Sequence, residues 1–153
     1  MNNKLKKISD YPDSWTIAKG LMENKPIFVR YKDSLVEAVG HPNYPFQIGV
    51  AVPLINPTED GLAIDSEASE LDSIEDALEK SFGENQQAIH VITITFNGMR
   101  EFVFYAAEWK PEHFEQKAKQ VEAGVRDGHK LQFMMQEDRE WETFKRFAWK
   151  RKN

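Results

Sequence analysis

Two β-rich runs joined by a single Asn-Gly dipeptide constrain the fold of this chain more than any other feature. The runs span residues 88–96 and 99–107, and Asn97-Gly98 lies between them. Asn-Gly favours a two-residue turn in which both residues take positive φ, so this segment predicts a β-hairpin. The turn also predicts the register, because a two-residue loop fixes which residues of the two strands lie opposite each other.

The predicted register places apolar side chains on both faces of this hairpin. The expected pairs on one face are Phe96 with Met99, Ile94 with Glu101, Ile92 with Val103, and His90 with Tyr105. The other face carries Phe102 and Phe104. Large exposed apolar patches are unusual on a monomer, so both faces must be covered. We expect a C-terminal helix carrying Trp141, Phe144 and Phe147 to cover the second face, with a dimer partner as the alternative.

Helical periodicity and strand patterns complete an α+β fold. Residues 67–82 repeat apolar side chains at helical spacing, with Ser66 as a capping residue and Gly83 at the end. A second helix begins at Pro111 and ends at Gly128, and strands are expected at residues 46–55 and 130–136. The order β-α-β-β-α-β predicts a ferredoxin-like core with an antiparallel sheet and two helices on one face.

The length of 153 residues indicates a single domain. We expect an N-terminal extension over 1–25, an extra strand and loop over 26–45, the ferredoxin-like core over 46–137, and a C-terminal helix over 138–153. Within the extension, residues 8–23 are weakly helical, with Ser14 as a capping residue. Asp138 is expected to cap the last helix.

Composition narrows the location and the partners. The chain has no cysteine, which excludes disulfides and thiol nucleophiles and suits a reducing compartment. No apolar segment resembles a secretory signal or a membrane span, so we expect a cytoplasmic location and no membrane partner. The net charge of −5 and the lack of interleaved basic and aromatic residues argue against a nucleic-acid partner.

Charge is distributed unevenly along the chain. Residues 56–86 contain ten acidic residues and one basic residue, whereas residues 143–153 contain five basic residues and no acidic one. One interpretation is that the acidic segment and the basic segment each form a solvated surface. The other is that the acidic helix around Glu67, Glu75 and Asp76 docks a basic protein partner.

Five segments resemble the bacterial domain of unknown function 695. They are Trp15 with the strand at 26–30, Gly61-Leu62 followed by Glu67, residues 71–78, residues 98–105, and residues 137–144. The chain departs from the usual pattern at Ala63, where the family often has Pro, and at Phe144, near which it often has an aromatic hydroxyl. The resemblance implies no activity. Similarity of that family to the ribonuclease E inhibitor B family implies a regulatory, protein-binding role, on fold analogy alone.

Few residue patterns in the sequence point to catalysis or to metal binding. The chain lacks a paired-histidine metal motif and a Gly-rich phosphate loop, so no metal or cofactor is expected. His41 and His129 are expected to be exposed in turns. His90, Tyr105 and Glu101 share one predicted sheet face and could perform acid–base chemistry, or simply form a structural hydrogen bond. Arg100 follows the hairpin turn, and Trp141 belongs to the covering helix.

These observations favour a non-catalytic protein-binding or regulatory domain. Two alternatives stay open: a small enzyme with a pocket at the His90 and Tyr105 face, and a homodimeric structural domain that pairs sheet faces. The sequence does not identify a ligand, a partner or an oligomeric state.

Overall fold

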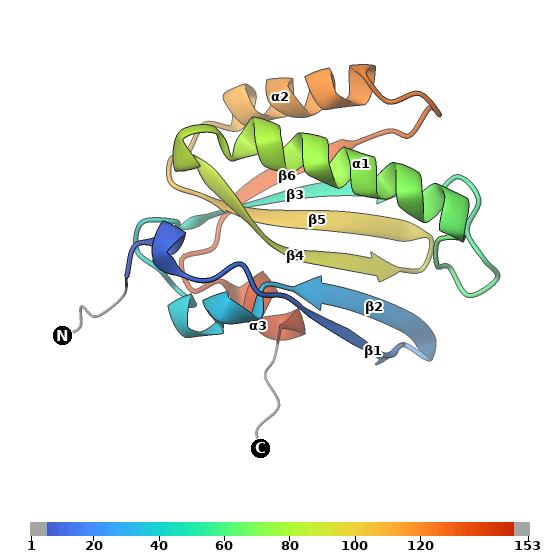
Figure 1. Ribbon diagram of the computed structural model, residues 1–153, viewed down its shortest axis with the longest axis horizontal. Coiled ribbons are helices and arrows are strands. Elements are labelled where there is room, and N and C mark those ends of the chain that lie inside the picture. The colour runs from blue at the N-terminus through green and yellow to red at the C-terminus, as the bar shows by residue number, and fades with distance from the viewer. Residues whose placement is uncertain (1–5, 149–153) are drawn as a thin grey trace.

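A six-stranded antiparallel sheet forms the centre of the protein, as the computed structural model shows for residues 6–148 (Figure 1). The strands are β1 (Thr16–Met22), β2 (Lys25–Tyr31), β3 (Phe46–Pro53), β4 (Ala88–Phe96), β5 (Met99–Ala106) and β6 (Gln132–Glu137). Their order across the sheet is β1-β2-β4-β5-β3-β6, and all neighbours run antiparallel. The prediction of an α+β fold with an antiparallel sheet is confirmed. The finer ferredoxin-like assignment stays a prediction.

Helices cover the two faces of the sheet unequally. Helices α1 (Asp65–Phe82) and α2 (Pro111–Ala123) lie on one face, where α1 contacts β4 and α2 contacts β6 (Figure 1). The apolar core beneath them includes Leu71, Phe82, Phe102, Phe104 and Phe114. The first helix begins at Asp65 without a side-chain cap, so Ser66 is not its capping residue, and it ends at Gly83 as predicted.

The other face is covered by short elements from both ends of the described chain. These are the 3₁₀ helices η1 (Ile8–Asp10) and η2 (Asp33–Ala38) and the helix α3 (Glu142–Phe147), while a third 3₁₀ turn, η3 (Glu84–Gln86), follows α1. Trp141 and Phe144 are fully buried in the core of this face, so the prediction that the C-terminal helix covers it is confirmed. Trp149 and the basic residues at 150–152 lie outside the described residues.

The central hairpin forms at the predicted turn. Asn97 and Gly98 take φ values of 50° and 83°, and Phe96 lies opposite Met99. The register holds as far as Ile92 opposite Val103 and then shifts at a β-bulge between His90 and Ile92. Beyond the bulge, His90 lies opposite Phe104 and Ile89 lies opposite Tyr105, so the predicted pairing of His90 with Tyr105 is wrong.

The N-terminal segment contradicts its prediction more broadly. Residues 16–22 form the edge strand β1 rather than a weak helix, and β1 pairs with β2 through a turn at Glu23 and Asn24. Both turn residues have positive φ, which Asn tolerates well. Ser14 does not cap a helix, because its hydroxyl donates to Asp33 Oδ1 at 2.6 Å.

Two helix ends also differ from expectation. The second helix ends at Gly124 rather than at Gly128, and Gly128 instead takes a φ of 83° in the following loop. Trp141, with a φ of 58°, occupies the position before α3. The last helix begins at Glu142 rather than directly after Asp138, so Asp138 is not its N-cap residue. Its carboxylate still accepts hydrogen bonds from the first-turn backbone N–H groups of Glu142 and Thr143.

Candidate functional site

The proposed trio of His90, Tyr105 and Glu101 is divided between the two faces of the sheet. The bulge turns His90 toward α1, where its Nδ1 lies 2.7 Å from Glu79 Oε2. Tyr105 points the other way and stacks on Trp141, with ring centroids 4.4 Å apart. The structure therefore does not assemble the acid–base site that the uninterrupted hairpin register predicts.

Tyr105 has a structural environment. Its hydroxyl donates to Asp138 Oδ2 at 2.7 Å, and its ring is fully buried against Trp141. Burial, followed by the neighbouring Asp138 carboxylate, raises the pKa of Tyr105 above its ordinary value, so the phenol stays protonated. Trp141 in turn donates its indole N–H to the carbonyl oxygen of Tyr44 at 2.9 Å. These contacts anchor α3 to the sheet.

Glu101 lies on the same sheet face as Tyr105, near β3. A Cβ atom at Gly49 would lie 2.6 Å from Glu101 Oε2, so the missing side chain of Gly49 makes room for this carboxylate. Burial raises the pKa of Glu101 above its ordinary value. Arg100 faces α1 instead, where its Nε donates to Thr95 Oγ1 at 2.8 Å and its guanidinium lies 3.8 Å from Asp72.

The three acidic residues proposed for docking have different environments. Glu67 is buried, accepts hydrogen bonds from the backbone N–H groups of Ile55 and Asn56, and lies 2.7 Å from His129 Nε2. It is therefore unavailable to a partner, and His129 is buried rather than exposed. Asp76 is exposed, and Glu75 is half-buried.

His41 is also buried, which contradicts the expectation that it is exposed in a turn. Its Nε2 lies 2.9 Å from the carbonyl oxygen of Lys6, and its Nδ1 accepts from the backbone N–H of Asn43. The ring packs edge-on against Tyr44. His41 therefore joins the N-terminal segment to the loop before β3 and has a structural role.

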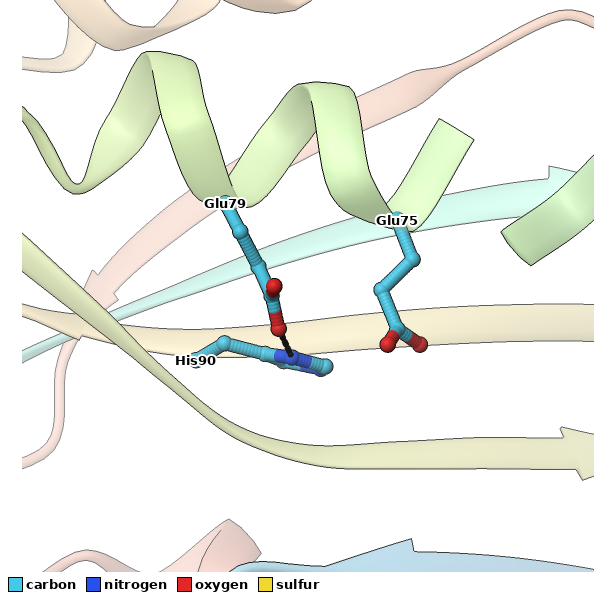
Figure 2. Close-up of side chains that lie close together, drawn as sticks. All are labelled: Glu75, Glu79 and His90. Carbon is cyan, nitrogen blue, oxygen red and sulfur yellow. Dashed lines mark hydrogen bonds and ion pairs between the residues drawn. The ribbon is translucent and has the colours of Figure 1, made fainter. Parts of the chain in front are cut away.

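Glu75, Glu79 and His90 form the only group of three potential metal-ligating side chains found among residues 6–148 (Figure 2). One ligand atom from each side chain lies within 4.8 Å of the others. Glu75 and Glu79 stand one turn apart on α1 and both point toward His90, which projects from β4 (Figure 2). Helical spacing of four residues brings the two carboxylates to one face, and the bulge brings the imidazole to them.

Further side chains hold this cluster in place. His90 Nε2 lies 2.8 Å from Thr93 Oγ1, and the Thr93 hydroxyl lies 3.3 Å from Glu75 Oε1. Arg30 forms an ion pair with Glu75 at 3.0 Å and also covers the ring of Trp15, which packs on His90. The His90 side chain is only 3% exposed, whereas that of Glu79 is 40% exposed. Solvent therefore reaches the cluster from the Glu79 side.

A groove of about 520 Å³ runs beside this cluster, between α1 and the β1–β2 hairpin. Its floor includes Ile17, Phe28 and Thr93, and its wall includes Asp72 and Asp76 of α1. Ile17 is 62% exposed and Phe28 is 36% exposed, although both are large apolar residues. The groove therefore combines the apolar side chains of Ile17 and Phe28 with two aspartates of α1, and Arg30 and Arg100 line it as well.

Part of this site can be predicted from the sequence. The acidic face of α1 and the spacing of Glu75 and Glu79 are visible in it. The contribution of His90 is not visible in the sequence, because it depends on a β-bulge that no residue pattern marks. The groove was missed because β1 was taken for a helix.

Comparison with protein-family models finds a match over residues 13–148 to a family described as "Family of unknown function (DUF695)". No curated protein and no solved structure matches the chain. Among residues 6–148, no helix has both the length and the apolar character needed to cross a membrane.

Proposed function

Because this chain belongs to the family of unknown function DUF695, we propose its function from its own surface: it is a non-catalytic domain that binds an amphipathic helix of a partner protein. The helix would lie in the groove between α1 and the β1–β2 hairpin. The observation that carries this proposal is the exposure of Ile17 and Phe28 on a sheet face whose remaining strands are covered. A cytoplasmic location belongs to the same proposal, since the cysteine-free sequence suits a reducing compartment.

The dimensions of the helix layer support a helical ligand. Packed helices lie about 8–10 Å apart and neighbouring strands about 4.8 Å apart, so one helix covers about two strands. The helices α1 and α2 thus account for about four of the six strands. The two left over, β1 and β2, lie at the end of the sheet beyond α1 (Figure 1). One further helix beside α1 would complete the layer.

Charge defines the expected partner further. The wall of the groove presents Asp72 and Asp76, and the Asp72 side chain is 75% exposed. Arg100 lies 3.8 Å from Asp72 and offsets part of its charge, which leaves Asp76 as the main acidic contact. The helix should therefore carry a Lys or Arg that faces Asp76 and apolar side chains toward Ile17 and Phe28. Its outer flank should be neutral or acidic, because Lys19 lies over the Phe28 ring there.

A photo-crosslinking residue at position 28 tests the proposal in cells of the source organism. The matched control carries the same residue at position 109, where Trp109 is 51% exposed but lies outside the groove. We expect position 28 to capture a segment of another protein with apolar residues at helical spacing and a basic flank. Capture of a second copy of this chain, of a segment without that pattern, or of the same protein by both positions would contradict the proposal.

Binding of the captured segment, made as a peptide, provides a quantitative check. Burying an Ile side chain contributes roughly 1.5–3 kcal/mol, so Ile17→Gln should weaken binding about tenfold or more. Ile55→Gln is the matched control, because Ile55 is 47% exposed and lies outside the groove. Asp76→Lys should weaken binding most at low salt. Equal affinities for the Ile17 and Ile55 variants would refute the assignment of the groove.

A further inference from the structure

We propose that Glu75, Glu79 and His90 bind a divalent transition-metal ion of the Zn²⁺ and Mn²⁺ class. The inference does not require a helix in the groove, although Glu75 and Thr93 line the groove as well. Each residue offers one ligand atom, and the three atoms lie within 4.8 Å of one another. They come from two elements that the core holds together, since α1 packs directly against β4.

The spacing requires only a small adjustment. Metal–ligand distances of about 2.1 Å place two ligands of a tetrahedral ion about 3.4 Å apart. His90 Nδ1 and Glu79 Oε2 are now 2.7 Å apart, at hydrogen-bond distance, so the ion would replace this contact. The Glu79 side chain is 40% exposed and belongs to a regular helix, so its carboxylate can rotate without moving the backbone. Glu75 stands one turn earlier on α1 (Figure 2), and one of its carboxylate oxygens lies within 4.8 Å of the other two ligand atoms.

His90 is held in the orientation that a metal ligand needs. Its Nε2 can donate to Thr93 Oγ1 at 2.8 Å, which leaves the Nδ1 lone pair directed at the two carboxylates. The ring packs between Trp15 and Phe104, with centroid distances of 5.1 and 5.0 Å. Such outer contacts fix the tautomer and the ring angle before an ion arrives.

The ligand set selects the class of ion. One imidazole nitrogen with two carboxylates suits Zn²⁺, Mn²⁺ or Fe²⁺, whereas Mg²⁺ and Ca²⁺ prefer sites made entirely of oxygen. Three protein ligands leave at least one coordination position for water. Arg30 lowers the net negative charge by pairing with Glu75, so we expect modest affinity rather than a permanently filled site.

Titration of the purified full chain with Zn²⁺, Mn²⁺ and Co²⁺ tests the proposal, with calorimetry for stoichiometry and Co²⁺ absorption for coordination. We expect one equivalent to bind, with an imidazole among the ligands. Loss of outer contacts typically costs 10–100-fold in metal affinity, so Glu79→Gln, which removes a direct ligand, should cost at least about tenfold. Thr93→Val removes an outer contact of His90 and should weaken metal binding about 10–100-fold.

Two controls distinguish this site from general surface binding. Asp76→Asn makes the same charge change on an exposed neighbour, and His113→Gln removes an exposed histidine. Neither should alter affinity. Thermal melts of Glu79→Gln confirm that the fold is retained, because this side chain is partly exposed. Failure of all three ions to bind at millimolar concentration, or equal losses in Glu79→Gln and Asp76→Asn, would overturn the proposal.

Discussion

Removal of the Glu67 carboxylate should destabilise the protein more than removal of any exposed acid on the same helix. Glu67 accepts hydrogen bonds from the backbone N–H groups of Ile55 and Asn56, at 2.5 and 2.8 Å, and lies 2.7 Å from His129. The Glu67 and His129 side chains are 4% and 1% exposed. This contact joins the start of α1 to the end of β3 and to the loop before β6, across 62 positions of sequence.

The expected cost follows from what the substitution leaves behind. Glu67→Ala strands two backbone donors and leaves His129 with no partner, since its Nδ1 already has none. Leaving a buried hydrogen-bond donor without a partner typically costs about 1–3 kcal/mol, so stranding two backbone donors should cost about 3 kcal/mol or more. For a chain of this size that corresponds to a fall of roughly 10 °C in Tm. Urea denaturation should show this loss for Glu67→Ala, whereas Asp76→Ala, on an exposed position, should change stability by less than about 0.5 kcal/mol.

The same contact predicts a pH dependence. Burial opposes ionisation of Glu67, but the hydrogen bonds from Ile55, Asn56 and His129 outweigh it and lower the pKa below the ordinary 4.5. A lowered carboxyl pKa stabilises the fold above pH 4.5, and this contribution is lost as the pH falls through the lower folded value. The difference in the free energy of unfolding between wild type and Glu67→Ala should therefore shrink as the pH falls below 4.5. A difference under about 1 kcal/mol at pH 7, or one unchanged at pH 3, would refute the reasoning.

Three further predictions follow from single contacts. Tyr105→Phe removes the hydrogen bond to the Asp138 carboxylate and should cost about 1.5–3 kcal/mol in chemical denaturation, and an unchanged midpoint would contradict a structural role. Gly98 has a φ of 83°, so Gly98→Ala should lower the free energy of unfolding by about 1 kcal/mol or more. Gly20→Ala, in an edge strand with no close neighbour, should not lower it. Equal effects of the two substitutions would count against the turn geometry. Burial disfavours only the ionised carboxylate of Glu101, so its pKa measured by NMR should lie above 4.5. For the same reason, Glu101→Gln should raise Tm at pH 7 but not at pH 3. A Glu101 midpoint at or below 4.5 would contradict that assignment.

Local patterns predicted the elements whose cause is local. Asn97-Gly98 gave the central hairpin because two adjacent residues determine a two-residue turn. Leu71 and Phe82 marked the buried face of α1 through helical periodicity alone. The burial of Trp141 followed from the need to cover a second apolar sheet face.

Features set by long-range packing were missed. The bulge between His90 and Ile92 reverses the direction of His90, yet each residue there suits a regular strand. Strand β1 is an exposed edge, so it lacks the buried alternation that marks a strand, although Asn24 offered a turn signal. The burial of Glu67 against His129 depends on residues far apart in the sequence, which no spacing rule brings together.

The proposed function depends on whether a partner helix occupies the groove beside α1. Isotope-filtered NMR of the labelled chain with the captured unlabelled segment measures this directly. We predict contacts from the segment to the Ile17 methyl groups and the Phe28 ring, together with a helical pattern of contacts within the segment. Contacts to the β6 edge of the sheet instead, or an extended segment paired with the β1 backbone, would contradict the proposed function.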